Sequence, residues 1–150
     1  MATETPAIAL RVSRTIDHPR EKVFKAWTET ESLAQWFAPS TDYRTVVTTL
    51  EPKLQGSYRI EMHHKDGNAH IIAGKYLEFS PPSKLVFTWV WEKPDAENTV
   101  VTIELKDKGG STEMILTHEK FDTADSRDHH EQGWNNLLDR LANALVPSTN

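Results

Sequence analysis

The chain has 150 residues, 37% of them hydrophobic and 26% charged, with 22 acidic and 17 basic side chains and a formal net charge of -5. This length and composition predict one globular domain over residues 1–150, with its core over about 8–146. The basic residues are scattered, which excludes the electrostatic footprint of a nucleic-acid binder. The chain has no cysteine. Disulfides, thiolate metal sites and cysteine nucleophiles are therefore excluded.

Residues 1–6 have neither the basic start nor the apolar run of a secretory signal peptide, so no such signal is expected there. The longest apolar stretches are too short to cross a bilayer. We therefore expect a cytoplasmic protein without a membrane span.

Alternating apolar residues predict a first strand over 8–16. A helix is expected to follow, with Asp17 or His18 as its cap, proline in its first turn and its end near Thr28. A second short helix is expected to be capped by Thr30 and stopped by Pro39.

The middle of the chain reads as consecutive antiparallel strands separated by proline, glycine and Asn/Asp turns. Leu85, Phe87 and Trp89 share one face of such a strand, which indicates that one face of the sheet is buried. A final amphipathic helix is expected from about Ser126 to Leu145. The strands are expected over residues 43–50, 56–64, 69–79, 84–92, 98–107 and 111–119.

Several motifs in this order resemble one family. They are Ile16-Asp17-His18-Pro19, Val23-Phe24-Lys25-Ala26-Trp27, Leu33-Ala34-Gln35-Trp36-Phe37, Gly56-Ser57-Tyr58, Gly74-Lys75-Tyr76-Leu77-Glu78-Phe79 with Pro81-Pro82, Leu116-Thr117-His118, Gly133-Trp134 and Leu137-Leu138. Over about residues 8–146 the chain resembles the proteins related to the activator of heat-shock-protein ATPase (AHSA-type). These belong to the SRPBCC or START-like superfamily, with polyketide cyclases and the birch-pollen-allergen fold.

The resemblance implies an α+β helix-grip fold. In this fold a curved antiparallel sheet wraps around a long C-terminal helix, two short helices follow the first strand, and a cavity lies between helix and sheet. The superfamily includes ligand carriers, cyclases and co-chaperone domains. The resemblance therefore implies a fold with a cavity more than a particular activity. The resemblance also implies that the co-chaperone itself is a larger protein with an additional N-terminal domain. An autonomous ATPase-activating role is therefore not expected of this chain.

Large side chains that alternate inward along the strands suit an apolar or aromatic ligand. A fully packed core would use the same residues. The candidate ligand-binding residues are Trp36, Tyr58, Met62, Tyr76, Trp89, Trp91, His118, His130 and Trp134.

Gly133 lies inside the predicted final helix, where glycine costs about 1 kcal/mol relative to alanine. Either close packing against a strand or the shaping of a cavity would explain it. The histidines predict no metal site, because adjacent pairs on a strand or a helix diverge. His118 and His130 are expected near each other, as structural histidines or as a proton-transfer group working with Tyr58 or Tyr76.

The leading hypothesis is a binding protein for a small apolar or aromatic molecule, such as a lipid, sterol or polyphenol. No metal or other cofactor is expected, because the chain has no phosphate-cradling loop and no dinucleotide fingerprint. One alternative is a co-chaperone-type interaction domain with a chaperone as partner. The other is a cyclase-like or hydrolytic enzyme acting on a hydrophobic substrate.

Overall fold

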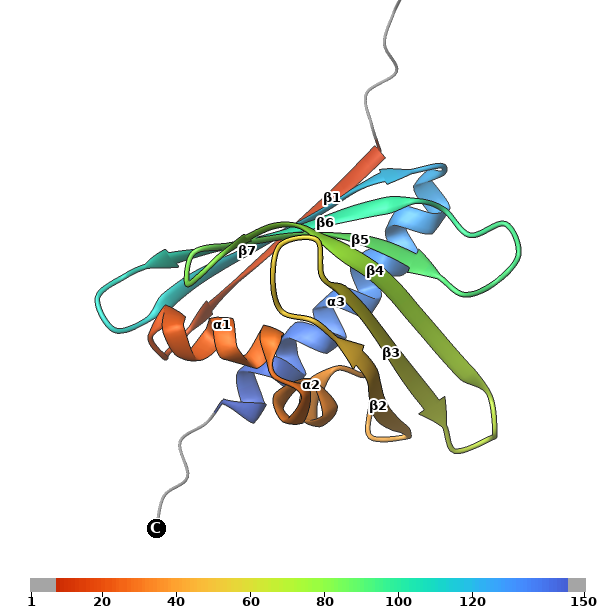
Figure 1. Cartoon of the computed structure of the whole chain (residues 1–150), viewed down its shortest axis with the longest axis horizontal. Coiled ribbons are helices and arrows are strands. Elements are labelled where there is room, and N and C mark those ends of the chain that lie inside the picture. The colour runs from red at the N-terminus through yellow and green to blue at the C-terminus, as the bar shows by residue number, and fades with distance from the viewer. Residues whose placement is uncertain (1–7, 146–150) are drawn as a thin grey trace, which may run out of the picture.

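The computed structural model describes residues 8–145 (Figure 1). The segment 1–6, for which no signal was expected, lies outside this range, as does residue 146 at the end of the expected core. The strands are β1 (Ile8–Ile16), β2 (Tyr43–Leu50), β3 (Ser57–His64), β4 (Ala69–Ser80), β5 (Lys84–Trp91), β6 (Thr99–Asp107) and β7 (Thr112–Phe121). The helices are α1 (Arg20–Thr28), α2 (Thr30–Trp36) and α3 (Ala124–Ala144).

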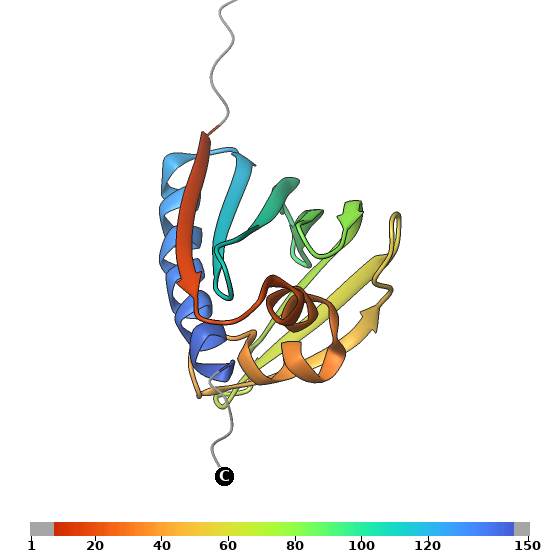
Figure 2. The ribbon, with the colours of Figure 1, turned by 90° about the vertical axis from the view of Figure 1, so that its left-hand side faces the viewer.

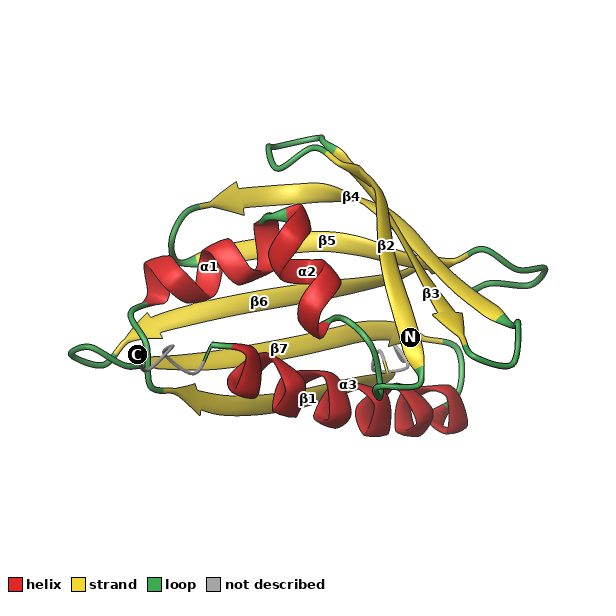
Figure 3. Ribbon diagram, turned by 90° about the horizontal axis from the view of Figure 1, so that it is seen from below, coloured by secondary structure: helices red, strands yellow, loops and turns green. Residues whose placement is uncertain are grey.

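The seven strands form one antiparallel sheet in the order β1-β7-β6-β5-β4-β3-β2. Strands β2 to β7 follow each other as the predicted meander, and β1 pairs with β7, with Val12 opposite Leu116. The sheet is bent, so that β2 and β3 run across the direction of β6 and β7 (Figure 3). This curved sheet with its long last helix is the expected helix-grip fold.

The expected cap residues of the two short helices are wrong by one or two positions. The N-cap of α1 is Pro19, whose extended backbone precedes the helix, and neither Asp17 nor His18 occupies that position. The N-cap of α2 is Glu29, so Thr30 is the first helical residue. Neither N-cap accepts a side-chain hydrogen bond. The capping residues predicted from the sequence therefore do not determine where these two helices begin.

Helix α3 begins two residues before the expected start. Its N-cap is Thr123, whose side chain accepts a hydrogen bond from the backbone N–H of Ser126. This bond satisfies one of the free N–H groups of the first turn.

We expect Thr123→Ala to lower the free energy of unfolding by about 1 kcal/mol and Thr123→Asp to retain it. Urea unfolding measures both, and an equal loss in both variants would contradict the capping role.

The three helices cover different parts of the concave face. Helix α3 lies along β1 (Figure 2), where Arg14 donates hydrogen bonds to Asn135 and Asp139. Helices α1 and α2 group at the end of the sheet where α3 finishes. There the Trp36 indole N–H donates to the Ala26 carbonyl, which joins α2 to α1. The C-terminal half of α3 therefore meets other helices, and its N-terminal half faces the sheet alone.

The pairing of β4 with β5 is interrupted at Gly74. A Cβ atom there would lie 2.0 Å from the Thr88 carbonyl oxygen, so only glycine allows this approach of the two backbones. The Lys75 N–H donates to the Thr88 hydroxyl instead of to a backbone carbonyl. The Thr88 carbonyl accepts a hydrogen bond from the Tyr58 hydroxyl. Side chains thus replace the missing backbone hydrogen bonds.

Candidate ligand-binding cavity

A cavity of about 580 Å³ lies between the N-terminal half of α3 and strands β3 to β5. This volume is within the range of about 300–1,000 Å³ that is usual for small-molecule sites. The exposed residues Ala69, His70, Lys93 and His129 are part of its lining, so the cavity opens to solvent. Its lining consists of Pro39, Met62, Ala69, His70, Ile71, Trp89, Trp91, Glu92, Lys93, Ser126, His129, His130, Gly133, Trp134 and Leu137.

Five of the nine residues proposed from the sequence line this cavity: Met62, Trp89, Trp91, His130 and Trp134. The Trp89 ring packs against Trp134, with centroids 4.8 Å apart, and edge-on against Trp91 at 5.4 Å. Three indole rings from a strand and a helix therefore form one continuous aromatic wall. Such a wall offers ring faces to a flat apolar molecule.

The other four proposed residues lie elsewhere. Trp36, at the end of α2, packs against Trp27 of α1 and donates its indole N–H to the Ala26 carbonyl. Tyr58 and Tyr76 are buried under these helices, beside a space of only about 20 Å³. Burial raises the pKa of the Tyr76 hydroxyl to about 12. His118 is fully buried behind Trp134 and does not line the cavity.

Several lining residues were not among the candidates predicted from the sequence. Ser126, His129 and Leu137 recur at helical spacing with His130 and Trp134, so helical periodicity was a signal for them. Glu92 and Lys93 follow the end of β5, where strand alternation stops. Nothing in the pattern pointed to that pair.

Gly133 lines the cavity, and apart from its chain neighbours and the backbone of its own helix no atom lies within 4 Å of the place where its Cβ would be. Of the two explanations given above, cavity shaping therefore fits the structure, and close packing against a strand does not. Any larger side chain at this position would project into open space. Glycine here keeps volume free at a cost in helix stability.

We expect Gly133→Ala to raise the free energy of unfolding by about 1 kcal/mol, because helix propensity improves and no clash is introduced. Chemical denaturation of the variant and the wild type measures the change. A loss of stability would show that the backbone needs glycine at this position.

His130 connects α3 to the end of β5 at the cavity. Its Nε2 accepts a hydrogen bond from the Trp91 indole N–H at 2.9 Å, and its Nδ1 donates to the Ser126 carbonyl at 2.8 Å. These partners fix the neutral tautomer with the proton on Nδ1. Burial lowers the pKa of His130, which favours the same neutral form.

His118 forms a second such pair deeper in the core. Its Nδ1 accepts from the Trp134 indole N–H at 3.0 Å, and its Nε2 donates to the Thr99 hydroxyl, which donates in turn to the Trp89 carbonyl. Burial, and secondarily the nearby His130, lowers the pKa of His118 to about 2. The two imidazoles lie 5.1 Å apart, so the expected proximity is confirmed. The unprotonated ring nitrogen of each imidazole already accepts a hydrogen bond from a tryptophan indole N–H.

Trp89 is the third indole of the wall, and its N–H has no hydrogen-bond partner among the described residues. That nitrogen is covered by protein, although the residue lines the cavity. Trp89 therefore offers a ligand its ring rather than its N–H group.

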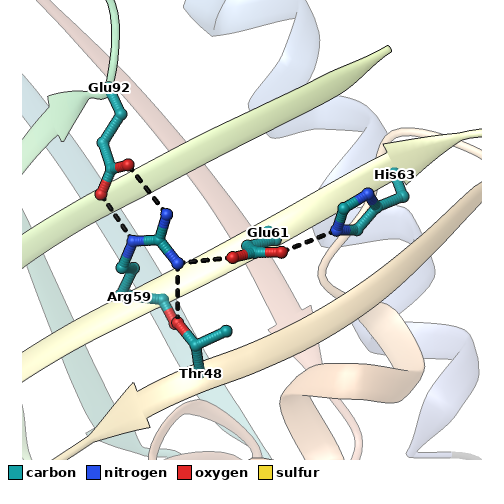
Figure 4. Close-up of polar contacts among 5 residues, drawn as sticks. All are labelled: Thr48, Arg59, Glu61, His63 and Glu92. Carbon is teal, nitrogen blue, oxygen red and sulfur yellow. Dashed lines mark hydrogen bonds and ion pairs between the residues drawn. The ribbon is translucent and has the colours of Figure 1, made fainter. Parts of the chain in front are cut away.

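An ion network on the outer face of the sheet reaches the cavity rim at Glu92. Arg59 donates to both Glu92 carboxylate oxygens, at 2.7 and 2.9 Å, and a third hydrogen bond goes to Glu61 (Figure 4). His63 lies 2.7 Å from the other oxygen of Glu61. The hydrogen bonds from Arg59 lower the pKa of Glu92, so this carboxylate stays ionised and paired.

Residues 17–146 match the family described as activator of Hsp90 ATPase homolog 1-like proteins. The chain belongs to this family. The motifs through which the sequence resembled it lie almost entirely within the matched range. No protein of curated function matches the chain.

Solved structures show the same fold at low sequence identity. A protein from Chromobacterium violaceum is 23% identical, with a TM-score of 0.86 over 93% of this chain and 98% of that one. A protein from Arthrobacter aurescens is 16% identical, with a TM-score of 0.84 over 99% and 92%. A protein from Rhodobacter sphaeroides is 21% identical, with a TM-score of 0.79 over 94% and 95%. These structural similarities support the fold described for this family member.

Within residues 8–145, none of the helices of this family member combines the length and the hydropathy that a membrane crossing requires.

Proposed function

We propose that this protein binds a small apolar or aromatic molecule in the cavity between α3 and the sheet. The observation that carries the proposal is Gly133, a costly residue in mid-helix that faces open volume. A helix selected only for stability gains about 1 kcal/mol from alanine at such a position. The glycine is therefore best explained by the volume it leaves free for a ligand.

The chemistry of the wall supports the same proposal. Trp89, Trp91 and Trp134 present rings, and Met62 and Leu137 add apolar surface. Hydrogen bonds to His118 and His130 hold two of these indoles in place. A preorganised aromatic wall binds with little loss of side-chain entropy. Planar polyphenols, sterols and lipids are the ligand classes that this wall fits.

The catalytic alternative has less support in this arrangement. A general base needs a lone pair directed at the substrate, and those of His118 and His130 accept indole N–H groups. The expected tyrosine partners lie under α1 and α2 rather than in the cavity. Binding is therefore the function we propose.

The test is amide NMR of the ¹⁵N-labelled protein during titration with a panel of lipids, sterols and planar polyphenols. We expect saturable shifts of the Gly133 amide and of the Trp91 and Trp134 indole N–H signals. Shifts confined to α1 and α2, or no shift with any member of the panel, would contradict the proposal. Lys106→Gln on β6, which does not line the cavity, is a control that should still saturate.

A second candidate function is a co-chaperone-type protein contact, which family membership and one surface feature favour. Leu54 and Leu77 are 58% and 47% exposed, and they are the large exposed hydrophobic residues of the described chain. A hydrogen bond from the Gln55 N–H to the Tyr76 carbonyl joins the two segments that carry them. Purified Hsp90 titrated with labelled protein tests this candidate, since Leu54→Ser with Leu77→Ser should abolish any binding.

A further inference from the structure

We infer that the cavity selects molecules whose apolar or aromatic body carries an anionic group, with Lys93 as the residue that recognises the anion. This inference rests on the proposed function and specifies the ligand class of the same cavity. It follows from the charges at the cavity rim.

Two residues with a full charge line the cavity, Glu92 and Lys93, and they differ in how they are paired. Both Glu92 oxygens accept hydrogen bonds from Arg59, so its negative charge is compensated from the outer face of the sheet. Lys93 is exposed and has no ion-pair partner among residues 8–145. The rim therefore carries an unpaired cation and a paired anion.

The neighbouring ionisable residues do not change this distribution of paired and unpaired charge at the rim. His70 and His129 also line the cavity and are exposed. Glu97 is a carboxylate in the loop after β5. Its oxygens accept hydrogen bonds from the Asp122 backbone N–H and the Ser126 hydroxyl, and it does not line the cavity. Lys93 is thus the one unpaired full charge among the residues that line the cavity, on a chain whose net charge is -5.

The interior lacks a comparable polar partner. The Trp91 and Trp134 N–H groups are used by histidines, and that of Trp89 is covered. A ligand that enters with its apolar body against the tryptophans therefore keeps its charged group at the mouth. A carboxylate, sulfonate or phenolate is the group that Lys93 would bind there.

Arg59 acts as a positioning residue in this arrangement. It does not line the cavity, yet it holds the Glu92 carboxylate and compensates its charge (Figure 4). Loss of Arg59 would leave an uncompensated carboxylate next to Lys93, which would then pair with Lys93 or repel an anionic ligand.

The experiment compares two fluorescent probes that differ by one sulfonate group. They are 8-anilinonaphthalene-1-sulfonate, which is anionic, and N-phenyl-1-naphthylamine, which is neutral. We expect Lys93→Gln to weaken the anionic probe about threefold at low salt and to leave the neutral probe unchanged, as for one exposed ion pair. Lys106→Gln makes the same charge change on β6, away from the cavity, and should alter neither affinity.

A second pair of variants separates positioning from structure. Arg59→Gln should weaken the anionic probe about twofold, and the double variant Arg59→Gln with Glu92→Gln should restore it. Equal effects of Lys93→Gln on both probes, or no effect on either, would overturn the inference and leave the proposed function standing. Failure of the neutral probe to saturate in the wild type would count against the proposed function itself.

Discussion

Gly74→Ala is expected to lower the free energy of unfolding by about 3 kcal/mol, the upper end of the usual cost of overpacking. The new Cβ would lie 2.0 Å from the Thr88 carbonyl oxygen and 2.7 Å from its hydroxyl oxygen. The nearest atom belongs to the backbone, which cannot rotate away. The strands must separate there, and the Tyr58 and Lys75 hydrogen bonds to Thr88 are strained with them.

Gly133→Ala is the matched control, because it adds the same methyl group to a glycine that faces open space. Urea unfolding of both variants beside the wild type should give changes of opposite sign. A Gly74→Ala variant as stable as the wild type would show that β4 and β5 can separate freely.

His118→Gln is expected to lower the free energy of unfolding at pH 7 by about 2–3 kcal/mol. His118 is 0% exposed, and its ring accepts from Trp134 and donates to Thr99. Glutamine cannot reproduce both hydrogen bonds with the same shape. Buried polar partners without a hydrogen bond each cost about 1–3 kcal/mol.

The same substitution should change how stability depends on pH. The pKa of His118 is about 2 in the folded protein against a reference of 6.5, so between these values the unfolded chain binds a proton that the folded chain does not. The contribution of the neutral His118 to the free energy of unfolding is therefore fully present above about pH 6.5 and is lost as the pH falls. At pH 4.5, two pH units below the reference, this loss amounts to roughly 3 kcal/mol in the wild type.

Denaturation of wild type and His118→Gln at pH 7, 5.5 and 4.5 measures this effect. The stability difference should shrink toward zero at pH 4.5, because the variant lacks the buried neutral imidazole. His129→Gln changes an exposed histidine that takes no part in the buried hydrogen bonds, and it serves as the control. A difference that stays constant over this range would contradict the burial of a neutral His118.

The fold was largely predictable because its signals are local. Alternation along Leu85, Phe87 and Trp89 and the turn residues between strands placed the meander, and they do not depend on distant contacts. The pairing of β1 with β7 joins segments about a hundred residues apart and left no local signal. The N-caps Pro19 and Glu29 were missed because extended backbone geometry, rather than a capping side chain, precedes each helix.

The candidate site was predictable only in part, for a physical reason. Alternation indicates that Tyr58, Tyr76 and Trp89 point inward, but it does not indicate which inward residues meet α1 and α2 and which meet empty volume. Tyr58 and Tyr76 fall at the filled end. Trp89 and Trp91 reach the open end beside α3. Only the packed positions of the helices separate these groups.

The rim could not be predicted at all. Lys93 follows the end of β5, where neither strand nor helix periodicity applies. The pairing of Glu92 with Arg59 spans three strands of the sheet, from β3 across β4 to the end of β5. Such charge pairing is visible only once the register of these strands is known.

The measurement that tests ligand binding most directly compares wild type with Gly133→Leu, which would extend a side chain into the cavity. N-phenyl-1-naphthylamine fluorescence should rise saturably with wild type and show at least about a tenfold weaker association with Gly133→Leu. The melting temperature of the variant should equal or exceed that of wild type, because leucine improves the helix and meets no atom at its Cβ. Equal binding by both proteins, with the variant fully folded, would contradict a ligand site in this cavity.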